Sequence, residues 1–385
     1  MSVLCLSVQG YRSLHDLAFE PGPLTVITGG NGVGKSNVYR AMELLHAAAH
    51  GRLAQTLARE GGLPSALWAG PEEVRTELAK REGRAVRGTS RKHSIRLCIG
   101  IRLPFACYEL ALGLPVRIPS DPSAFDTDPM VKEEHLWHAP RRRPSNTWLV
   151  REGPAARCLD RAKEWRTYAP LDVTDTVLAQ LDEPMLLPEL HQLRATLRRF
   201  RFYHGFRTDP ESPLRTPQHG VRTPVLASSG EDLAAALQTI LEIGDRETLE
   251  RAVREGLDAE LDLACNPFEV GLRVSGLLRR LGARELSDGS LKYLALLAAL
   301  HSPRPAPLLV LNEPEASLHP KLHAPLAKSI HAAAAHAQIW VISHARALVD
   351  AIESLGPTRR IELERDTEGA TRVVGQGMLD RPLWP

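Results

Sequence analysis

The stretch LTVITGGNGVGKSNVYRAMELL, residues 24–45, decides the fold expected for this chain of 385 residues. It opens with an apolar, β-branched run that predicts a short buried strand. The next eight residues match the phosphate-loop pattern G-x-x-x-x-G-K-[ST] at every position: Gly29, Gly30, Asn31, Gly32, Val33, Gly34, Lys35 and Ser36. Val38, Met42 and Leu45 then recur at helical spacing. A strand, a glycine-rich loop and a helix in this order predict a phosphate-binding loop.

Each part of this loop has a chemical reason. Glycines let backbone amides turn inward with no Cβ in the way. Lys35 would bring its ammonium to the β- and γ-phosphates of a nucleotide, and Ser36 would ligate Mg²⁺. The helix that starts in the loop adds free amides and a partial positive charge. The alternative, a glycine-rich turn before an ordinary helix, leaves the lysine and serine without a role.

The composition of the chain argues against several classes of protein and of site. Lys plus Arg total 48 against 46 Asp plus Glu, so the net charge of +2 gives no global nucleic-acid signature. The 5 cysteines form no C-x-x-C pair, so neither a zinc site nor a disulfide framework is indicated. No apolar run reaches the length of a membrane span. With no secretory signal pattern at the N-terminus, we expect a cytoplasmic protein with no membrane partner.

Periodicity predicts the remaining elements. Alternating apolar residues predict one hairpin from strands at 3–8 and 14–19, and a second from strands at 94–101 and 105–112. Helical spacing, with a polar start and Gly244 as a stop, predicts helices up to about residue 50 and at 72–81, 187–200, 233–243 and 247–263. His46 and His50 stand at i, i+4, which suits a metal site, but we favour an ordinary helix surface.

The segment RRFRFYHGFR, residues 198–207, mixes arginines with aromatic residues. Such a mixture grips phosphates and stacks bases in single-stranded nucleic-acid sites. A half-buried strand with a solvated arginine face shows the same alternation, and the arginines would also suit contacts to nucleotide phosphates. The sequence leaves these interpretations open.

Three later motifs follow the phosphate loop. LSDGS (residues 286–290) opens an apolar helix, NEPEASLHP (312–320) follows a continuous apolar strand at 307–311, and SH (343–344) follows another at 338–342. Short apolar strands alternating with helices predict a parallel sheet. Polar residues at the carboxyl ends of such strands are where α/β sheets bind ligands.

Read together, these motifs resemble the nucleotide-binding head of ABC-type ATPases, in particular the soluble RecF/SMC-like branch and its bacterial predicted ATPases. The phosphate loop GGNGVGKSN, which ends at Asn37, the signature LSDGS, the Walker B strand LLVLNEPE, the D-loop SLHP and the switch histidine in ISH stand in the family's order. The resemblance implies an α/β P-loop NTPase with a β-rich N-terminal lobe and a mixed, largely parallel core sheet.

The resemblance also implies roles. Lys35 and Ser36 would bind the phosphates and Mg²⁺ of ATP, Glu313 would polarise the attacking water, and His344 would contact the γ-phosphate. Ser287, Asp288 and Gly289 would cap the nucleotide of a second protomer, which implies an ATP-dependent homodimer. We expect an ATPase lobe at 1–114, an inserted strand- and loop-rich segment at 115–200, and a second ATPase lobe at 201–385. The glutamine of the Q-loop has no clear counterpart.

Asn312 departs from the family, in which an Asp precedes the catalytic Glu. An amide keeps one acceptor oxygen but removes a charge beside Mg²⁺, so slow hydrolysis is expected. The expected function is an ATP-driven switch in DNA repair or in defence against foreign DNA, with DNA or RNA as a partner. The alternatives are an ATPase that regulates an effector protein without nucleic acid, and an ATP-binding module with little turnover.

Overall fold

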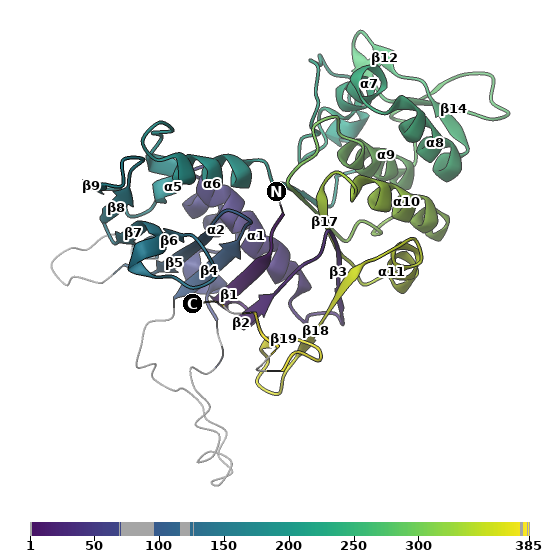
Figure 1. The fold of residues 1–385 in the computed structure, drawn as a ribbon. Coiled ribbons are helices and arrows are strands. Elements are labelled where there is room, and N and C mark those ends of the chain that lie inside the picture. Colours follow the sequence, from purple (N-terminus) through teal and green to yellow (C-terminus); the bar gives the residue numbers. More distant parts are fainter. Residues whose placement is uncertain are drawn as a thin grey trace. The chain divides into compact units, whose positions relative to one another are not determined.

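The computed structural model describes residues 2–68, 70, 96–115, 124–125, 127–377, 380–382 and 384. The expected helix at 72–81 lies outside these residues. The chain forms two compact units, each assembled from segments far apart in the sequence (Figure 1). Unit 1 comprises Met1–Ser2, Gly22–Thr28 and Arg199–Ile361; unit 2 comprises Val3–Pro21, Gly29–Arg198 and Glu362–Pro385.

Unit 1 is built on parallel strands in the order β10 (Arg201–His204), β16 (Leu308–Asn312), β17 (Gln338–Ile342) and β3 (Leu24–Gly29). In strand order the sheet continues through β18 (Arg359–Arg365) and β19 (Thr371–Val373), whose residues from Glu362 onward are assigned to unit 2. Every residue of β16 and β17 is buried. Their continuous apolar sequences are what a parallel sheet covered on both faces requires, so the predicted parallel strands are confirmed.

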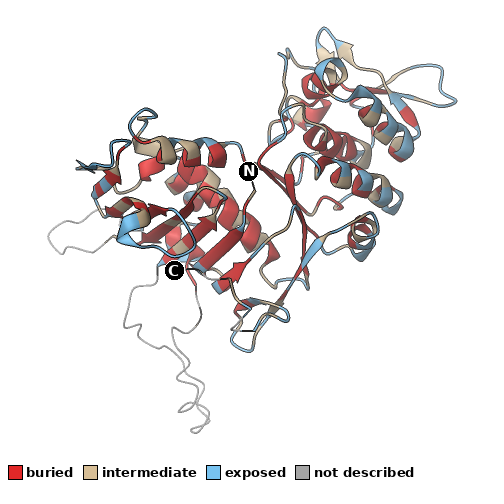
Figure 2. Ribbon diagram, viewed as in Figure 1, coloured by how far each residue is buried: buried red, intermediate tan, exposed pale blue. Residues whose placement is uncertain are grey.

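Five helices cover this part of unit 1: α7 (Leu233–Ile243), α8 (Arg246–Leu257), α9 (Asp288–Leu300), α10 (His323–Ala333) and α11 (Arg346–Glu353). Helix α9 is buried without a break from Leu291 to Leu300, because it packs against α7, α8 and α10 (Figure 2). Short elements complete the unit: η2 (Pro213–Arg215), β11 (Ala259–Leu261), β12 (Ala264–Cys265), β13 (Phe268–Glu269), β14 (Gly271–Val274), β15 (Leu281–Gly282) and η3 (Pro320–Leu322).

Unit 2 contains an eight-stranded antiparallel sheet in the order β2-β1-β4-β5-β6-β7-β8-β9. Its strands are β1 (Cys5–Tyr11), β2 (Leu14–Phe19), β4 (Leu97–Arg102), β5 (Cys107–Gly113), β6 (Met130–Trp137), β7 (Thr147–Glu152), β8 (Ala155–Leu159) and β9 (Trp165–Tyr168). The strands β6 to β9 of region 115–200 therefore share a sheet with β1, β2, β4 and β5 of region 1–114, because β5 pairs directly with β6.

The helices of unit 2 gather around α1 (Lys35–Ala49), which contacts β1, α2 (Leu53–Arg59), α5 (Val177–Gln180) and α6 (Pro188–Arg198). Val38, Met42 and Leu45, the predicted apolar stripe of α1, are fully buried. The unit also has α3 (Leu63–Ala66) and η1 (Pro144–Asn146). The helix that follows the phosphate loop is thus confirmed.

Both predicted hairpins, β1–β2 and β4–β5, are confirmed by antiparallel pairing. The predicted end of the helix at 247–263 is wrong. Helix α8 stops at Leu257 because Asp258 takes a left-handed conformation with φ of 50°, a common helix end, and β11 begins at Ala259. The side chain of Asp245 starts α8 by accepting a hydrogen bond from the amide of Thr248.

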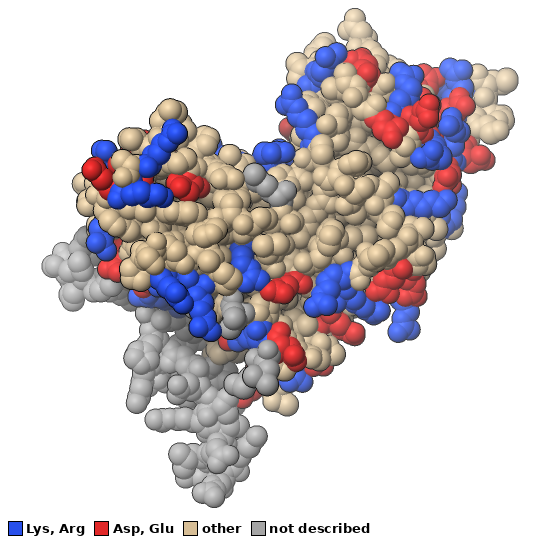
Figure 3. Space-filling model, in the orientation of Figure 1, with Lys and Arg blue, Asp and Glu red and all other residues tan. Residues whose placement is uncertain are grey.

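Among the residues that the structure describes, no helix combines the length and the apolar character needed to cross a bilayer. On the face shown in Figure 3, Lys and Arg side chains lie interspersed with Asp and Glu side chains in both units. This mixture agrees with the net charge of +2.

Candidate nucleotide-binding site

The phosphate loop lies in unit 2, between the end of β3 and the start of α1. Gly34 caps α1 with φ of 104°, a conformation that glycine adopts without strain. A Cβ on Gly34 would lie 2.3 Å from Thr371 Oγ1, so the position also needs glycine for space. Lys35 is 6% exposed, and its Nζ donates to the carbonyls of Gly29 and Gly30, each at 2.8 Å. The ammonium is held inside the loop that the sequence assigned to phosphate.

Side chains from distant segments brace this loop. Thr371 Oγ1 donates to the carbonyl of Val33 at 2.7 Å and lies 2.7 Å from Ser13 Oγ. The amide group of Asn37 donates to Ser13 Oγ at 2.9 Å. Asn37 therefore supports the loop from the first turn of α1, in addition to its expected place in the nucleotide-binding set.

The carboxyl ends of the parallel strands in unit 1 gather the second group of predicted residues. In the sheet register, His204 of β10 stands beside Asn312 of β16, and Asn312 stands beside Ile342 of β17. Asn312 is 3% exposed, and its Nδ2 lies 2.6 Å from His204 Nδ1. Among the described residues, Asn312 Oδ1 has no hydrogen-bond partner.

The turn after Asn312 has an uncommon backbone. Glu313 has φ of 50° and Ser317 has φ of 64°, and both are non-glycine residues in the left-handed region. Glu313 donates its amide to the carbonyl of Ile342 at 2.8 Å, and its own carbonyl accepts from the amide of Ala316 at 3.1 Å. Such outliers persist where the surroundings over-determine them, and they concentrate at functional sites.

Glu315 fixes the predicted switch histidine. One oxygen of its buried carboxylate, Oε1, accepts from Ser343 Oγ at 2.6 Å and from the amides of His344 and Ala345 at 3.1 and 3.2 Å. His344 Nδ1 lies 3.5 Å from Glu315 Oε1 and 3.8 Å from Glu313 Oε1. The structure thus brings Glu313 and His344 close together, and Glu315 contacts the predicted switch histidine.

Lys292 joins helix α9 to the same turn. Its Nζ donates to the carbonyls of Ala316 at 2.6 Å and Glu313 at 3.2 Å. The side chain is only 4% exposed, and this burial lowers the pKa of Lys292 although Glu315 and Glu313 raise it. The turn that carries Glu313 is therefore hydrogen-bonded to helix α9, which begins at the signature motif.

The signature motif forms the exposed N-terminus of α9. Ser287 is the cap, with Oγ accepting from the amide of Ser290 at 3.1 Å. Asp288 accepts from the Nη2 of Arg215 at 2.6 Å, and the Nη1 of Arg215 donates to the carbonyls of Ala283 and Leu286 at 3.0 and 2.8 Å. Gly289 lies close to the D-loop, since a Cβ there would be 3.1 Å from the carbonyl of Ser317.

The basic aromatic segment contains the half-buried strand β10, and its aromatic rings do not form a stacking surface. Its aromatic residues are all buried: Phe200, Phe202, Tyr203 and Phe206. Arg198 donates to the carbonyl of Ala49 at the end of α1, and Arg207 is paired with Asp209. Base stacking on these rings is excluded, because the rings form core.

The histidine pair His46 and His50 lies at the end of α1. Both side chains are part-buried, and His46 Nδ1 lies 2.9 Å from the carbonyl of Leu197. His319 Nδ1 accepts from the amide of Lys321. Within the described part of the chain, no group of three His, Cys, Asp or Glu side chains is placed to hold a metal ion.

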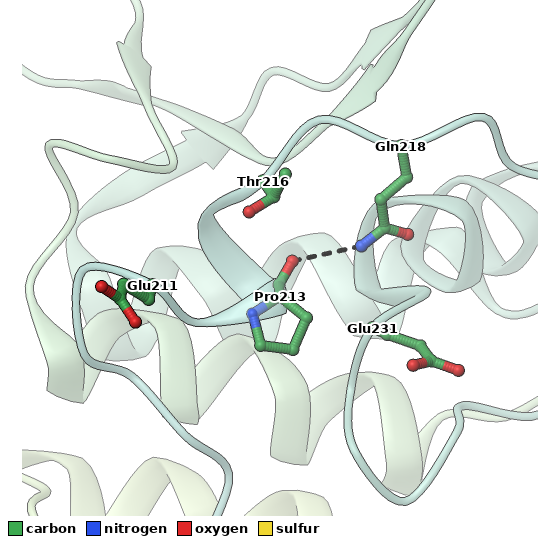
Figure 4. Close-up of a pocket in the computed structure, with 5 residues that line it drawn as sticks. All are labelled: Glu211, Pro213, Thr216, Gln218 and Glu231. Atoms are coloured by element: carbon green, nitrogen blue, oxygen red, sulfur yellow. Dashed lines mark hydrogen bonds between the residues drawn. The ribbon is translucent and has the colours of Figure 1, made fainter.

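A depression of about 470 Å³ lies beside η2 in unit 1, lined by Glu211, Pro213, Thr216, Gln218 and Glu231. Figure 4 shows Glu211 and Glu231 on opposite sides of Pro213, whose carbonyl accepts from Gln218 at 3.2 Å. None of the five lining residues is basic, so this depression does not suit a phosphate group.

Sequence reasoning missed four residues of this arrangement: Ser13, His204, Lys292 and Thr371. Glu315 lies within the motif at 312–320, but no sequence pattern indicates its role. Only His204 had a usable signal, because it ends a strand of the parallel sheet as Asn312 does.

Comparison with known proteins gives the family. Residues 158–350, half of the chain, match the family described as "AAA domain, putative AbiEii toxin, Type IV TA system". The chain belongs to this AAA family. The match runs from β8 to α11 and so includes the signature, the Walker B strand and the switch histidine, but not the phosphate loop. A search of curated proteins found no match.

Solved SMC heads have the same fold. The SMC head bound to the C-winged helix domain of ScpA is 14% identical, with 98% of each chain covered and a TM-score of 0.51. An SMC head with an extended coiled coil, bound to the C-terminal domain of ScpA derived from Pyrococcus furiosus, is 13% identical over 97% of this chain and 96% of that chain, with a TM-score of 0.51. The predicted fold class, a P-loop NTPase of the ABC/SMC head type, is confirmed.

Proposed function

We propose that this chain binds and hydrolyses Mg²⁺–ATP and acts in the cytoplasm as a nucleotide-dependent dimerising switch. The observation that carries the proposal is the buried ammonium of Lys35 at the N-terminus of α1. The amino end of a helix and a glycine-rich loop offer backbone amides to an anion, and a lysine in such a loop brings positive charge to phosphate groups. The phosphates of ATP are such an anion, and membership of this AAA family supports ATP as the ligand.

Glu313 and His344, which follow the carboxyl ends of strands in unit 1, would carry out the hydrolysis of ATP. Glu313 has a half-exposed carboxylate on a constrained turn, which suits a group that orients the attacking water. His344 is about half exposed and backed by Glu315, so its ring can approach the γ-phosphate while its backbone stays fixed. Phosphoryl transfer needs mainly positioning and charge stabilisation, which is what this arrangement offers.

Ser36 and Asn312 are the residues that would hold Mg²⁺. The unpaired, buried Oδ1 of Asn312 fits this role, because Mg²⁺ retains several waters and an amide oxygen accepts a hydrogen bond from one. When bound, Mg²⁺ neutralises charge that develops on the phosphates. An amide brings no negative charge to the metal, so we expect slow turnover and a long-lived ATP-bound state.

Calorimetry with a non-hydrolysable ATP analogue tests the proposal. Lys35→Ala should weaken analogue binding at least tenfold, because it removes the buried cation. Glu313→Gln should keep binding and abolish phosphate release. Equal analogue affinity in wild type and Lys35→Ala would show that the loop does not bind the nucleotide.

DNA repair or defence against foreign DNA is the cellular role we propose for the switch. The buried aromatic residues of 198–207 favour a second candidate, an ATPase that acts on a partner protein without nucleic acid. The two SMC heads, each solved with a domain of ScpA, are consistent with that candidate. Salt titrations of DNA and RNA binding in each nucleotide state separate them, because phosphate contacts weaken steeply with salt.

A further inference from the structure

We propose that His204 is a positioning residue for Asn312. By holding the side-chain amide so that Oδ1 faces the water shell of the metal, His204 allows Asn312 to take the role of a carboxylate. The inference rests on the proposed binding of Mg²⁺–ATP. It concerns an interaction between two strands, since His204 ends β10 and Asn312 ends β16 at the same level of the parallel register. Register partners in neighbouring strands direct their side chains to the same face of a sheet.

The need for such a residue follows from the chemistry of asparagine. Both oxygens of a carboxylate accept hydrogen bonds, so an aspartate at this position would serve the metal in either orientation. An asparagine has one acceptor and one donor group, and only one of its two orientations presents the oxygen. Without a partner that distinguishes the two orientations, half of the arrangements would direct an NH₂ group to the metal's waters.

The contact between Asn312 and His204 distinguishes the two orientations of the amide. Asn312 Nδ2 lies 2.6 Å from His204 Nδ1, while Oδ1 is buried with no hydrogen-bond partner among the described residues. With Nδ2 as the donor, the imidazole accepts through Nδ1 and carries its proton on Nε2. The donor end of the amide is thereby used, and the acceptor end stays available. An unpaired buried acceptor is costly unless a ligand or water satisfies it.

The chain offers a matched set of variants. The Oδ1 of an asparagine side chain reaches the place of a histidine Nδ1, so His204→Asn should keep the acceptor beside Asn312. His204→Gln places its amide near the former Nε2 instead, and His204→Ala has no acceptor. His191, exposed on α6 of unit 2, provides the control variant His191→Ala.

The experiment measures Mn²⁺ binding by electron paramagnetic resonance in the presence of a non-hydrolysable ATP analogue. His204→Ala and His204→Gln should raise the Mn²⁺ dissociation constant about tenfold, the low end of the effect of removing an outer-shell partner. His204→Asn and His191→Ala should match wild type. The affinity for the analogue in EDTA should be the same in all variants, which shows that the fold and the phosphate loop are intact.

A second comparison isolates the orienting role. In the Asn312→Asp background, His204→Ala should change the Mn²⁺ dissociation constant less than twofold, because a carboxylate needs no orientation; the double-mutant cycle measures that difference. Unchanged Mn²⁺ affinity in His204→Ala and His204→Gln, with normal analogue binding, would overturn the inference alone. Absence of analogue binding in wild type would instead overturn the proposed function.

Discussion

Lys292 is the one charged residue in a stretch of helix α9 that is otherwise apolar and buried. Its ammonium gives up hydration and in return donates to two carbonyls of the turn that carries Glu313. Burial of the ammonium lowers the pKa of Lys292. A methionine would fill the same space without the cost of a buried charge, so stability alone does not explain a lysine here. The two hydrogen bonds give it a role, because they hold the backbone of the turn that carries Glu313.

We therefore predict that Lys292→Met separates binding from catalysis. ATP-analogue affinity should stay within twofold of wild type, while single-turnover phosphate release should slow about tenfold or more, since small displacements of a catalytic group are costly. Stopped-flow phosphate detection measures the rate. Lys328→Met removes an exposed lysine on α10 and serves as the control. Equal rates in Lys292→Met and wild type would show that the turn does not need this support.

The motifs predict site residues that stand at or next to the end of an apolar strand or a glycine-rich loop. Such positions are held by Lys35, Asn312, Glu313 and His344. Residues such as Lys292 and Thr371 act through contacts with segments distant in the sequence. Spacing along the chain carries no signal for such contacts, which only the folded sheet and helices create.

At the scale of whole elements, Arg215 ties the start of α9 to the segment around η2. The guanidinium is 9% exposed and donates to the carbonyls of Thr208, Ala283, Arg284 and Leu286 and to the carboxylate of Asp288. A guanidinium has five donors in a fixed fork, so one side chain can hold several carbonyls of a loop. Arg215 thus holds the start of α9 in place, although the first residues of this helix are exposed.

Replacing this guanidinium should be destabilising. We predict that Arg215→Met lowers the free energy of unfolding by about 2–4 kcal/mol, because several buried carbonyls lose their donor. Urea unfolding followed by circular dichroism measures the change. Arg222→Met removes an exposed arginine whose ion pair with Glu242 lies at the surface, and it should cost less than about 1 kcal/mol. A loss below that of the control would show that other contacts hold the loop.

Elements with strong periodicity were the ones predicted correctly. The strands β16 and β17 and the helix α1 have apolar patterns that only a covered sheet and an amphipathic helix explain. The end of α8 was missed because Asp258, unlike glycine, gives no clear stop signal in the sequence. The strands β6 to β9 joined an existing sheet through β5–β6 pairing, a long-range contact that local patterns do not specify.

At the scale of the whole molecule, the predicted site residues are divided between the units: the phosphate loop belongs to unit 2, and the signature, Glu313 and His344 belong to unit 1. The family match covers the second set only, so the phosphate loop rests on its own sequence and geometry. On the face shown in Figure 3, charges of both signs are mixed, so this face offers no broad electrostatic attraction for nucleic acid. We expect a specific contact, rather than overall charge, to bind a partner.

The signature motif is where we expect that contact with a second copy of the chain. Ser287 and Asp288 are exposed at the N-terminus of α9, where free amides and the helix dipole favour the γ-phosphate of a nucleotide held by the other protomer. ATP with the hydrolysis-deficient Glu313→Gln variant should therefore give a dimer with twice the monomer mass in light scattering. Adding Ser287→Arg should prevent the dimer, because a long charged side chain would fill the space meant for the phosphate.

The matched control for this dimer test is Ser229→Arg, which adds the same side chain at another exposed serine in unit 1, shortly before helix α7. In the Glu313→Gln background it should leave the ATP-dependent dimer intact, since its position has no signature motif. ATP-analogue binding by the monomer should be unchanged in both arginine variants, because the phosphate loop belongs to the other unit. If Glu313→Gln stays monomeric with ATP, or if Ser287→Arg dimerises as well as Ser229→Arg, the signature does not act across a dimer interface.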